Sequence, residues 1–151
     1  MNIQISDIGQ VIQLAIAPVF LLAGVGTKLM VLTNRLARII DRSRTLEDRL
    51  DQGYHEAYMD ELDVLFQRSH LINVAITLST ACGLLVCLVI AMLFVDDVAH
   101  WQLDKFIAAF FVLGMAALIG SFVYLLREIR IASISLRARR HRRPAAAPPS
   151  Q

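Results

Sequence analysis

The sequence predicts an all-α integral membrane protein with three transmembrane helices, the first two extended into a cytoplasmic antiparallel helical hairpin. Three observations predict this: long apolar runs, arginines confined to alternate loops, and a helical repeat that continues beyond the apolar runs. Of the 151 residues, 56% are hydrophobic and 19% are charged, with a mean hydropathy of +0.56. With only two Cys, four Pro and seven Gly, the composition excludes disordered, collagen-like and disulfide-rich secreted proteins.

Three apolar runs are long enough to cross a bilayer. Leu71 to Val95 and Phe106 to Leu126 contain no charged residue, and about 20 residues suffice for a hydrocarbon core of roughly 30 Å. The first run, Ile8 to Thr33, contains Lys28 near its arginine-rich end. No Lys or Arg precedes this run, so it lacks the basic region of a signal peptide and is expected to be retained. The predicted spans are therefore about 8–33, 71–95 and 106–126.

The basic residues lie almost entirely on one side of these spans. Thirteen arginines lie between residues 34 and 70 or after residue 126, whereas the opposite side carries Lys105 alone. Cytoplasmic loops of membrane proteins are enriched in Lys and Arg. The sequence thus predicts a bacterial inner-membrane protein with its N-terminus outside and its C-terminus in the cytoplasm.

Residues 34–70 carry the spacing of paired helices rather than of a loop. Apolar and small residues recur at steps of three and four along each arm, and the break between the arms falls at Asp51 to Gly53. The outgoing positions are Leu32, Leu36, Ile39, Ser43, Leu46 and Leu50, and the returning ones are Tyr58, Leu62, Leu65, Ser69, Ile72, Ile76, Ser79 and Gly83. This spacing predicts that the two arms form an antiparallel helical hairpin.

Charge is expected to select the register of the two arms. The outgoing arm is rich in arginine, and the returning arm carries Glu56, Asp60, Glu61 and Asp63. Antiparallel pairing sets Arg49 near Glu56, and Arg42 or Arg44 near Asp60 or Asp63. Each exposed pair contributes at most about 1 kcal/mol, so the apolar seam must supply the stability. The acidic surface is either simply solvated or a docking site for a cytoplasmic protein.

The second span carries small residues at strict steps of four, which predicts a close helix-packing seam. This seam serves either packing within the chain or self-association into a homo-oligomer, and the sequence leaves both open. Its members are Ala75, Ser79, Gly83, Cys87 and Ala91.

Polar residues at membrane depth are candidate functional residues because lipid cannot satisfy them. Gln13 and Asn73 are expected to form hydrogen bonds between helices or to line an ion path through an oligomer. Lys28 either shares that path or extends its long stem to the interface.

A denser polar cluster is expected where the three helices leave the bilayer on the arginine-rich side. These groups either anchor the helices through local ion pairs or bind anionic lipid headgroups or a partner's acidic face. The cluster comprises Asn34, Arg35, Arg38, Asp41, Arg42, Arg68, Arg127, Glu128 and Arg130.

No catalytic, cofactor or metal site is predicted. Cys82 and Cys87 are five residues apart on a helix and so point in different directions, which favours two buried small side chains. The loop residues Asp96, Asp97, His100 and Asp104 contain metal-ligand types, but short polar loops need such residues anyway, and Asp104 suits a helix N-cap.

Four blocks carry a family resemblance: QVIQLAIAPVFLLAGVG from Gln10, LTNRLARIIDRSR from Leu32, LINVAITLSTACGLLVCLVIAMLF from Leu71 and LREIRIASISLR from Leu126. Together they resemble a bacterial inner-membrane family, domain of unknown function 2721. The resemblance covers about residues 5–137 and implies a small three-helix membrane protein with no catalytic residues to transfer.

We expect one membrane domain, residues 1–137, followed by a disordered tail, 138–151, that is first basic and then rich in Pro and Ala. The expected role is non-enzymatic: a membrane scaffold or regulatory subunit presenting the hairpin to a cytoplasmic protein. The alternative is a homo-oligomeric channel or transporter-like assembly. The expected surroundings are a bilayer with anionic headgroups, and nucleic acid is not expected because the basic run at residues 139–143 is short and lacks aromatic residues.

Overall fold

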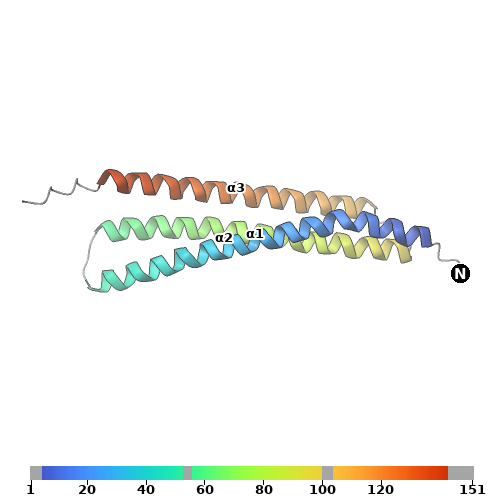
Figure 1. The fold of residues 1–151 in the computed structure, drawn as a ribbon, viewed down its shortest axis with the longest axis horizontal. Coiled ribbons are helices and arrows are strands. Elements are labelled where there is room, and N and C mark those ends of the chain that lie inside the picture. The colour runs from blue at the N-terminus through green and yellow to red at the C-terminus, as the bar shows by residue number, and fades with distance from the viewer. Residues whose placement is uncertain (1–4, 53–55, 100–103, 143–151) are drawn as a thin grey trace, which may run out of the picture.

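The computed structural model describes residues 5–52, 56–99 and 104–142, all of them in three long helices (Figure 1). They are α1, Ile5–Gln52; α2, Glu56–Ala99; and α3, Asp104–Arg142. The helices extend along a common long axis, and α1 crosses over α2 in this view. The all-helical architecture is therefore confirmed for the described residues.

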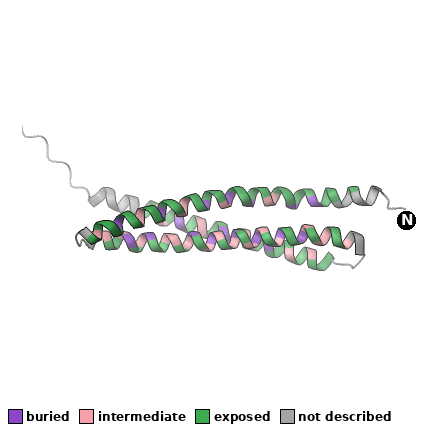
Figure 2. Cartoon of the chain, turned by 90° about the horizontal axis from the view of Figure 1, so that it is seen from below, coloured by how far each residue is buried: buried purple, intermediate pink, exposed green. Residues whose placement is uncertain are grey.

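Each helix contains a segment that is long and apolar enough to cross a membrane. These segments lie within Ile12–Asp51, Tyr58–Asp96 and Asp104–Ile134. Large apolar side chains such as Phe20, Leu84 and Val112 point away from the bundle and are more than 60% exposed. Exposed residues cover the outer faces of the helices (Figure 2). Apolar side chains on an outer surface fit lipid rather than water, which indicates a multi-pass membrane protein.

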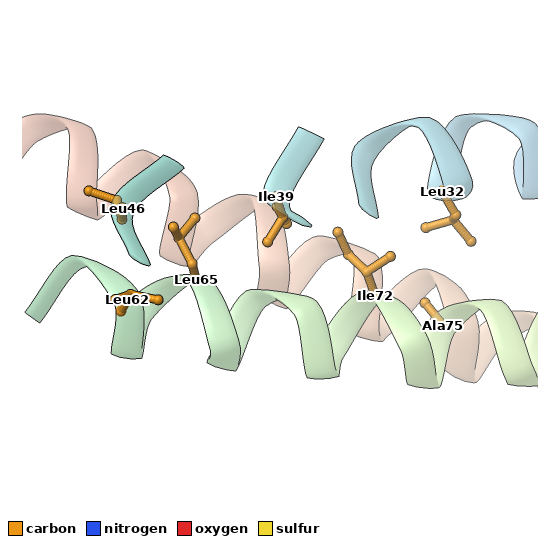
Figure 3. Packing of buried hydrophobic residues seen from close by; sticks show 7 residues of the cluster. All are labelled: Leu32, Ile39, Leu46, Leu62, Leu65, Ile72 and Ala75. Carbon is orange, nitrogen blue, oxygen red and sulfur yellow. The ribbon is translucent and has the colours of Figure 1, made fainter. Parts of the chain in front are cut away.

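The buried residues of α1 recur every seven positions. Val25, Leu32, Ile39 and Leu46 are at most 5% exposed and follow one line along the helix. A seven-residue repeat keeps one helix face against a neighbour over many turns. Leu32, Ile39 and Leu46 pack against α2 in the largest buried cluster (Figure 3). Their partners on α2 are Leu62, Leu65, Ile72 and Ala75.

The middle helix packs against both of the others. Along the described residues, α2 packs on α1 and on α3, whereas no Cα atom of α1 lies within 8 Å of one in α3. Gly114 is buried where α3 packs on α2, and a Cβ there would make ordinary van der Waals contacts, 3.5 Å from Leu85 Cβ and 3.8 Å from the Cys82 carbonyl oxygen. The helices approach more closely at Gly120, where a Cβ would lie 3.3 Å from Leu78 Cδ1. Small residues at a helix contact allow such packing in lipid.

The predicted seam of small residues is only partly buried. Ala75 and Ser79 are fully buried and Gly83 is half-buried, but Cys87 and Ala91 are exposed. A step of four residues turns a helix by about 40° more than one full turn, so a strict repeat of four drifts off the contact face. The buried positions instead follow steps of seven: Ile72, Ser79 and Val86, with Ala75, Cys82 and Val89. The expectation that Cys87 is buried is wrong for the same reason.

The C-terminal helix is longer than the predicted span. It continues to Arg142, so residues 138–142 are helical rather than part of the tail. Residues 143–151 lie outside the described residues.

Candidate functional site

The predicted polar cluster contains one buried ionic centre. Glu128 of α3 is fully buried, and its Oε2 accepts a hydrogen bond from Arg35 Nη1 of α1 at 2.5 Å. Its Oε1 accepts from Arg68 Nε and Nη2 of α2, at 3.0 and 2.8 Å. One carboxylate thus joins all three helices. We call Arg35, Arg68 and Glu128 the arginine–glutamate triad.

The position of Glu128 in the sequence explains why it reaches this centre. It lies seven residues after Ser121 and fourteen after Gly114, and all three are buried on the face of α3 that meets α2. The uncharged run of α3 ends at Leu126, just before the triad. A buried carboxylate is stable only with counter-charges and hydrogen bonds, which the two guanidinium groups supply.

The other residues of the predicted cluster do not join the triad. Arg42 instead donates from Nε to Glu61 Oε1 at 3.0 Å, which links the arms of α1 and α2. This is one of the arginines expected to pair across the arms, although its partner is Glu61 rather than Asp60 or Asp63. The pairing of Arg49 with Glu56 lies outside the described side chains. The remaining members are exposed: Asn34, Arg38, Asp41, Arg127 and Arg130.

A second polar centre lies about 10 Å further along the bundle, one seven-residue repeat from Arg35. Lys28 is only 9% exposed and donates from Nζ to Ser121 Oγ at 2.9 Å. Ser121 donates in turn to the Ala75 carbonyl oxygen at 2.6 Å, so Ser79, whose Oγ lies 2.7 Å from Ser121 Oγ, must be the donor of that contact. Ser121 therefore has all its hydrogen-bonding capacity filled.

Lys28 is thus directed into the bundle, which contradicts the expectation that its stem extends to the interface. Its Nζ also lies 3.5 Å from the centroid of the Phe122 ring. A cation over an aromatic face is attracted by the ring quadrupole. The Phe122 ring and the Ser121 hydroxyl supply, within the bundle, part of the solvation that a snorkelling lysine would find in water.

The two centres share one geometry and together bridge α1 to α3. Lys28 and Arg35 are seven residues apart on α1, and their partners Ser121 and Glu128 are seven apart on α3. Because the backbones of α1 and α3 do not approach closely, these long side chains span the distance. The sequence did not lead us to expect that Ser121 would bond to several side chains. Its position could have been recognised from the repeat Gly114, Ser121 and Glu128, which places small or polar residues at steps of seven along a largely apolar segment.

Gln13 and Asn73 do not meet inside the bundle. Both are exposed on its outer surface, Gln13 on α1 and Asn73 on α2. Within the described part of the chain, neither residue therefore takes part in a hydrogen-bonded core between the helices.

The described residues contain no group of three or more His, Cys, Asp or Glu side chains placed to hold a metal ion. Of the four loop residues considered for a metal, His100 lies outside the described part of the chain, and so does the side chain of Asp97. Chemically, the triad holds two guanidinium cations, those of Arg35 and Arg68, in place at the level where the uncharged run of α3 ends.

Comparison with curated proteins and with solved structures finds no match. A family model, described as "Protein of unknown function (DUF2721)", matches residues 15–138. The match includes both polar centres and most of all three helices. In this chain the matched region is built from three helices. The chain therefore belongs to this family, whose function is unknown.

Proposed function

We propose that this protein is a non-enzymatic scaffold or regulatory subunit of the bacterial inner membrane that presents a cytoplasmic helical hairpin to a protein partner. The observation that carries the proposal is the continuity of α1 and α2 beyond their apolar segments. Past the triad, α1 runs from Arg35 to Gln52, about 25 Å of helix, with Ile39 and Leu46 packed on α2. Packed antiparallel arms in a coiled-coil arrangement form a rigid projection rather than a loop.

The ionic contacts support a stiff connection between membrane and hairpin. The triad ties the three helices where the apolar segment of α3 ends, and Arg42 with Glu61 ties the arms one repeat further on. A partner bound to the arms is therefore mechanically linked to α3. Both carboxylate oxygens of Glu128 are occupied by guanidinium groups, which favours a structural role over general-base chemistry.

The proposed topology places the hairpin and the C-terminus in the cytoplasm. Reporter domains that are active only in the cytoplasm, inserted at Gly53 or fused after Arg143, are expected to be active at both positions. A reporter in the loop near Gln102 should be inactive and serves as the control. Activity at Gln102 together with silence at Gly53 would invert the topology and remove the hairpin from the cytoplasm.

The outward face of the returning arm fits a partner with a basic and partly apolar surface. Asp60 and Asp63 are exposed, and so are two large apolar side chains, Met59 at 45% and Phe66 at 58%. Glu61, by contrast, is engaged by Arg42. An acidic rim beside exposed apolar side chains is typical of a protein-binding surface.

Replacing Asp60 and Asp63 together by lysine is expected to abolish recovery of a cytoplasmic partner, because two favourable charges become two repulsive ones. Glu61 is left intact so that the arms stay paired. The matched control replaces Glu47 and Asp48, exposed on the outgoing arm, by lysine, and should leave recovery unchanged. The measurement is cross-linking and identification of proteins retained by the full-length chain in native membranes. Equal recovery of the partner by the unmodified chain, the Asp60 and Asp63 variant and the control variant would overturn the proposed docking face.

The second candidate function is a homo-oligomeric channel or transporter-like assembly. The exposed face of α2 favours it, since Asn73, Thr77 and Thr80 place polar side chains where lipid would otherwise cover them. Thr77 and Thr80 donate to carbonyl oxygens of their own helix, whereas the Asn73 amide needs an acceptor and a donor from elsewhere.

Asn73→Leu distinguishes this candidate. If copies associate through this face, the variant should dissociate in mild detergent while the unmodified chain keeps an oligomeric mass in light scattering. Thr45→Leu, an exposed position on the hairpin arm, is the control. A strictly monomeric unmodified chain would exclude a pore, because three packed helices leave no room for one.

A further inference from the structure

The triad carries more positive charge than its carboxylate can neutralise. One glutamate meets two arginines, which leaves a net charge of +1 at a centre joining all three helices. The carboxylate is fully buried, but the arginine side chains are 38% and 23% exposed. The excess charge is therefore presented at the surface of the bundle.

Several N–H groups of the triad have no acceptor in the described part of the chain. Arg35 uses only Nη1 on Glu128, so its Nε and Nη2 are free, and Arg68 leaves Nη1 free. Glu128 fixes both guanidinium groups in one orientation. Pre-positioned, partly exposed guanidinium donors are the usual means of binding a phosphate group, often through two parallel hydrogen bonds.

The neighbouring charges add attraction for an anion. Arg38 lies one helical turn from Arg35, and Arg127 adjoins Glu128; both are exposed. The nearest exposed carboxylate on α1, Asp41, lies six residues beyond Arg35, about 9 Å toward the hairpin tip. Glu61 is already paired with Arg42. No described acid therefore offsets the excess charge of the triad at its own level.

The depth of the triad selects the kind of anion. The uncharged run of α3 ends at Leu126, two residues before Glu128, so the triad lies where hydrocarbon gives way to headgroups. At that depth the abundant anion is the phosphate of a glycerophospholipid. We propose that the guanidinium groups of Arg35 and Arg68, oriented by Glu128, bind the phosphate of one phospholipid with a net negative headgroup. This proposal does not depend on a cytoplasmic partner.

The test uses the full chain in nanodiscs made from equal parts phosphatidylcholine and phosphatidylglycerol, followed by native mass spectrometry of the lipids that remain bound. The unmodified chain should retain one phosphatidylglycerol in preference to phosphatidylcholine. Arg35→Gln should reduce this retention about tenfold, the loss of one charge-assisted hydrogen bond. Arg44→Gln removes the same charge from an exposed position of the arm and should change retention less than about twofold.

Each other outcome overturns the proposal. Equal losses in the two variants would show diffuse attraction to the whole basic surface. Equal retention of both lipids by the unmodified chain would show that the site does not prefer a net negative headgroup, as the proposal requires, and this comparison decides the matter even if Arg35→Gln does not fold. Displacement of phosphatidylglycerol by an equal concentration of inorganic phosphate would assign the site to free phosphate instead of a lipid.

Discussion

Replacing Glu128 by glutamine is expected to lower the free energy of unfolding by about 2–3 kcal/mol. The change removes the charge that both guanidinium groups share and leaves an amide with one acceptor atom where there were two. Breaking a fully buried ion pair costs about 3–5 kcal/mol. Because Arg35 and Arg68 are partly exposed, solvent and headgroups screen part of this loss, and the expected value is lower.

The measurement is reversible unfolding of the purified chain in mixed micelles of increasing denaturing detergent, followed by circular dichroism. Glu47→Gln, which removes the same charge from an exposed position of α1, is the control and should unfold like the unmodified chain. Arg35→Gln combined with Glu128→Gln should be less destabilised than the sum of the single changes, since each removes part of the other's unpaired charge. Identical unfolding of Glu128→Gln and Glu47→Gln would contradict a stabilising triad.

Replacing Lys28 by methionine is expected to act in the opposite direction and raise the free energy of unfolding by about 1–2 kcal/mol. A cation at the centre of a membrane helix costs about 2.5–3.5 kcal/mol, and Lys28, one seven-residue repeat from the headgroup level at Arg35, keeps part of this cost. The hydrogen bond to Ser121 and the contact with the Phe122 ring offset only part of that cost. Methionine fills the same space without charge, and Ser121 keeps its contacts with Ser79 and Ala75.

Lys105→Met is the matched control, because Lys105 is exposed at the start of α3, and it should leave stability unchanged. Both variants are measured by the same detergent titration. A fall in stability with Lys28→Met would mean that the ammonium group is a required link between α1 and α3 rather than a tolerated cost. A stabilised variant that loses partner binding would instead point to a function for Lys28.

The membrane spans could be predicted from the sequence because lipid imposes a local requirement. A helix that crosses hydrocarbon must satisfy its own backbone and expose apolar side chains, so runs such as Leu71 to Val95 and Phe106 to Leu126 identify it without knowledge of its neighbours. The buried positions Leu32, Ile39 and Leu46 could likewise be predicted, because apolar residues spaced three and four apart lie on one face of a helix.

Contacts between helices were harder to predict because they depend on which faces meet. The sequence favoured a seam of small residues at steps of four, but packing along a seven-residue repeat leaves Cys87 and Ala91 outside it. It grouped nine polar residues at one level, of which Arg35, Arg68 and Glu128 converge while most of the others are exposed. Polar residues at the same depth in the membrane contact one another only if the side chain of each also points into the bundle.

The helical character of the chain, the number of its helices that can cross a bilayer and the places where its charges are concentrated are properties of single segments, so the order of amino acids was enough to predict them. The inward turn of Lys28 onto Ser121 and the pairing of one glutamate with two arginines became visible only in the packed helices. A buried charge is stabilised by partners far away in the chain, 93 residues from Arg35 to Glu128 and 60 from Arg68 to Glu128. Their positions are fixed only when the helices pack.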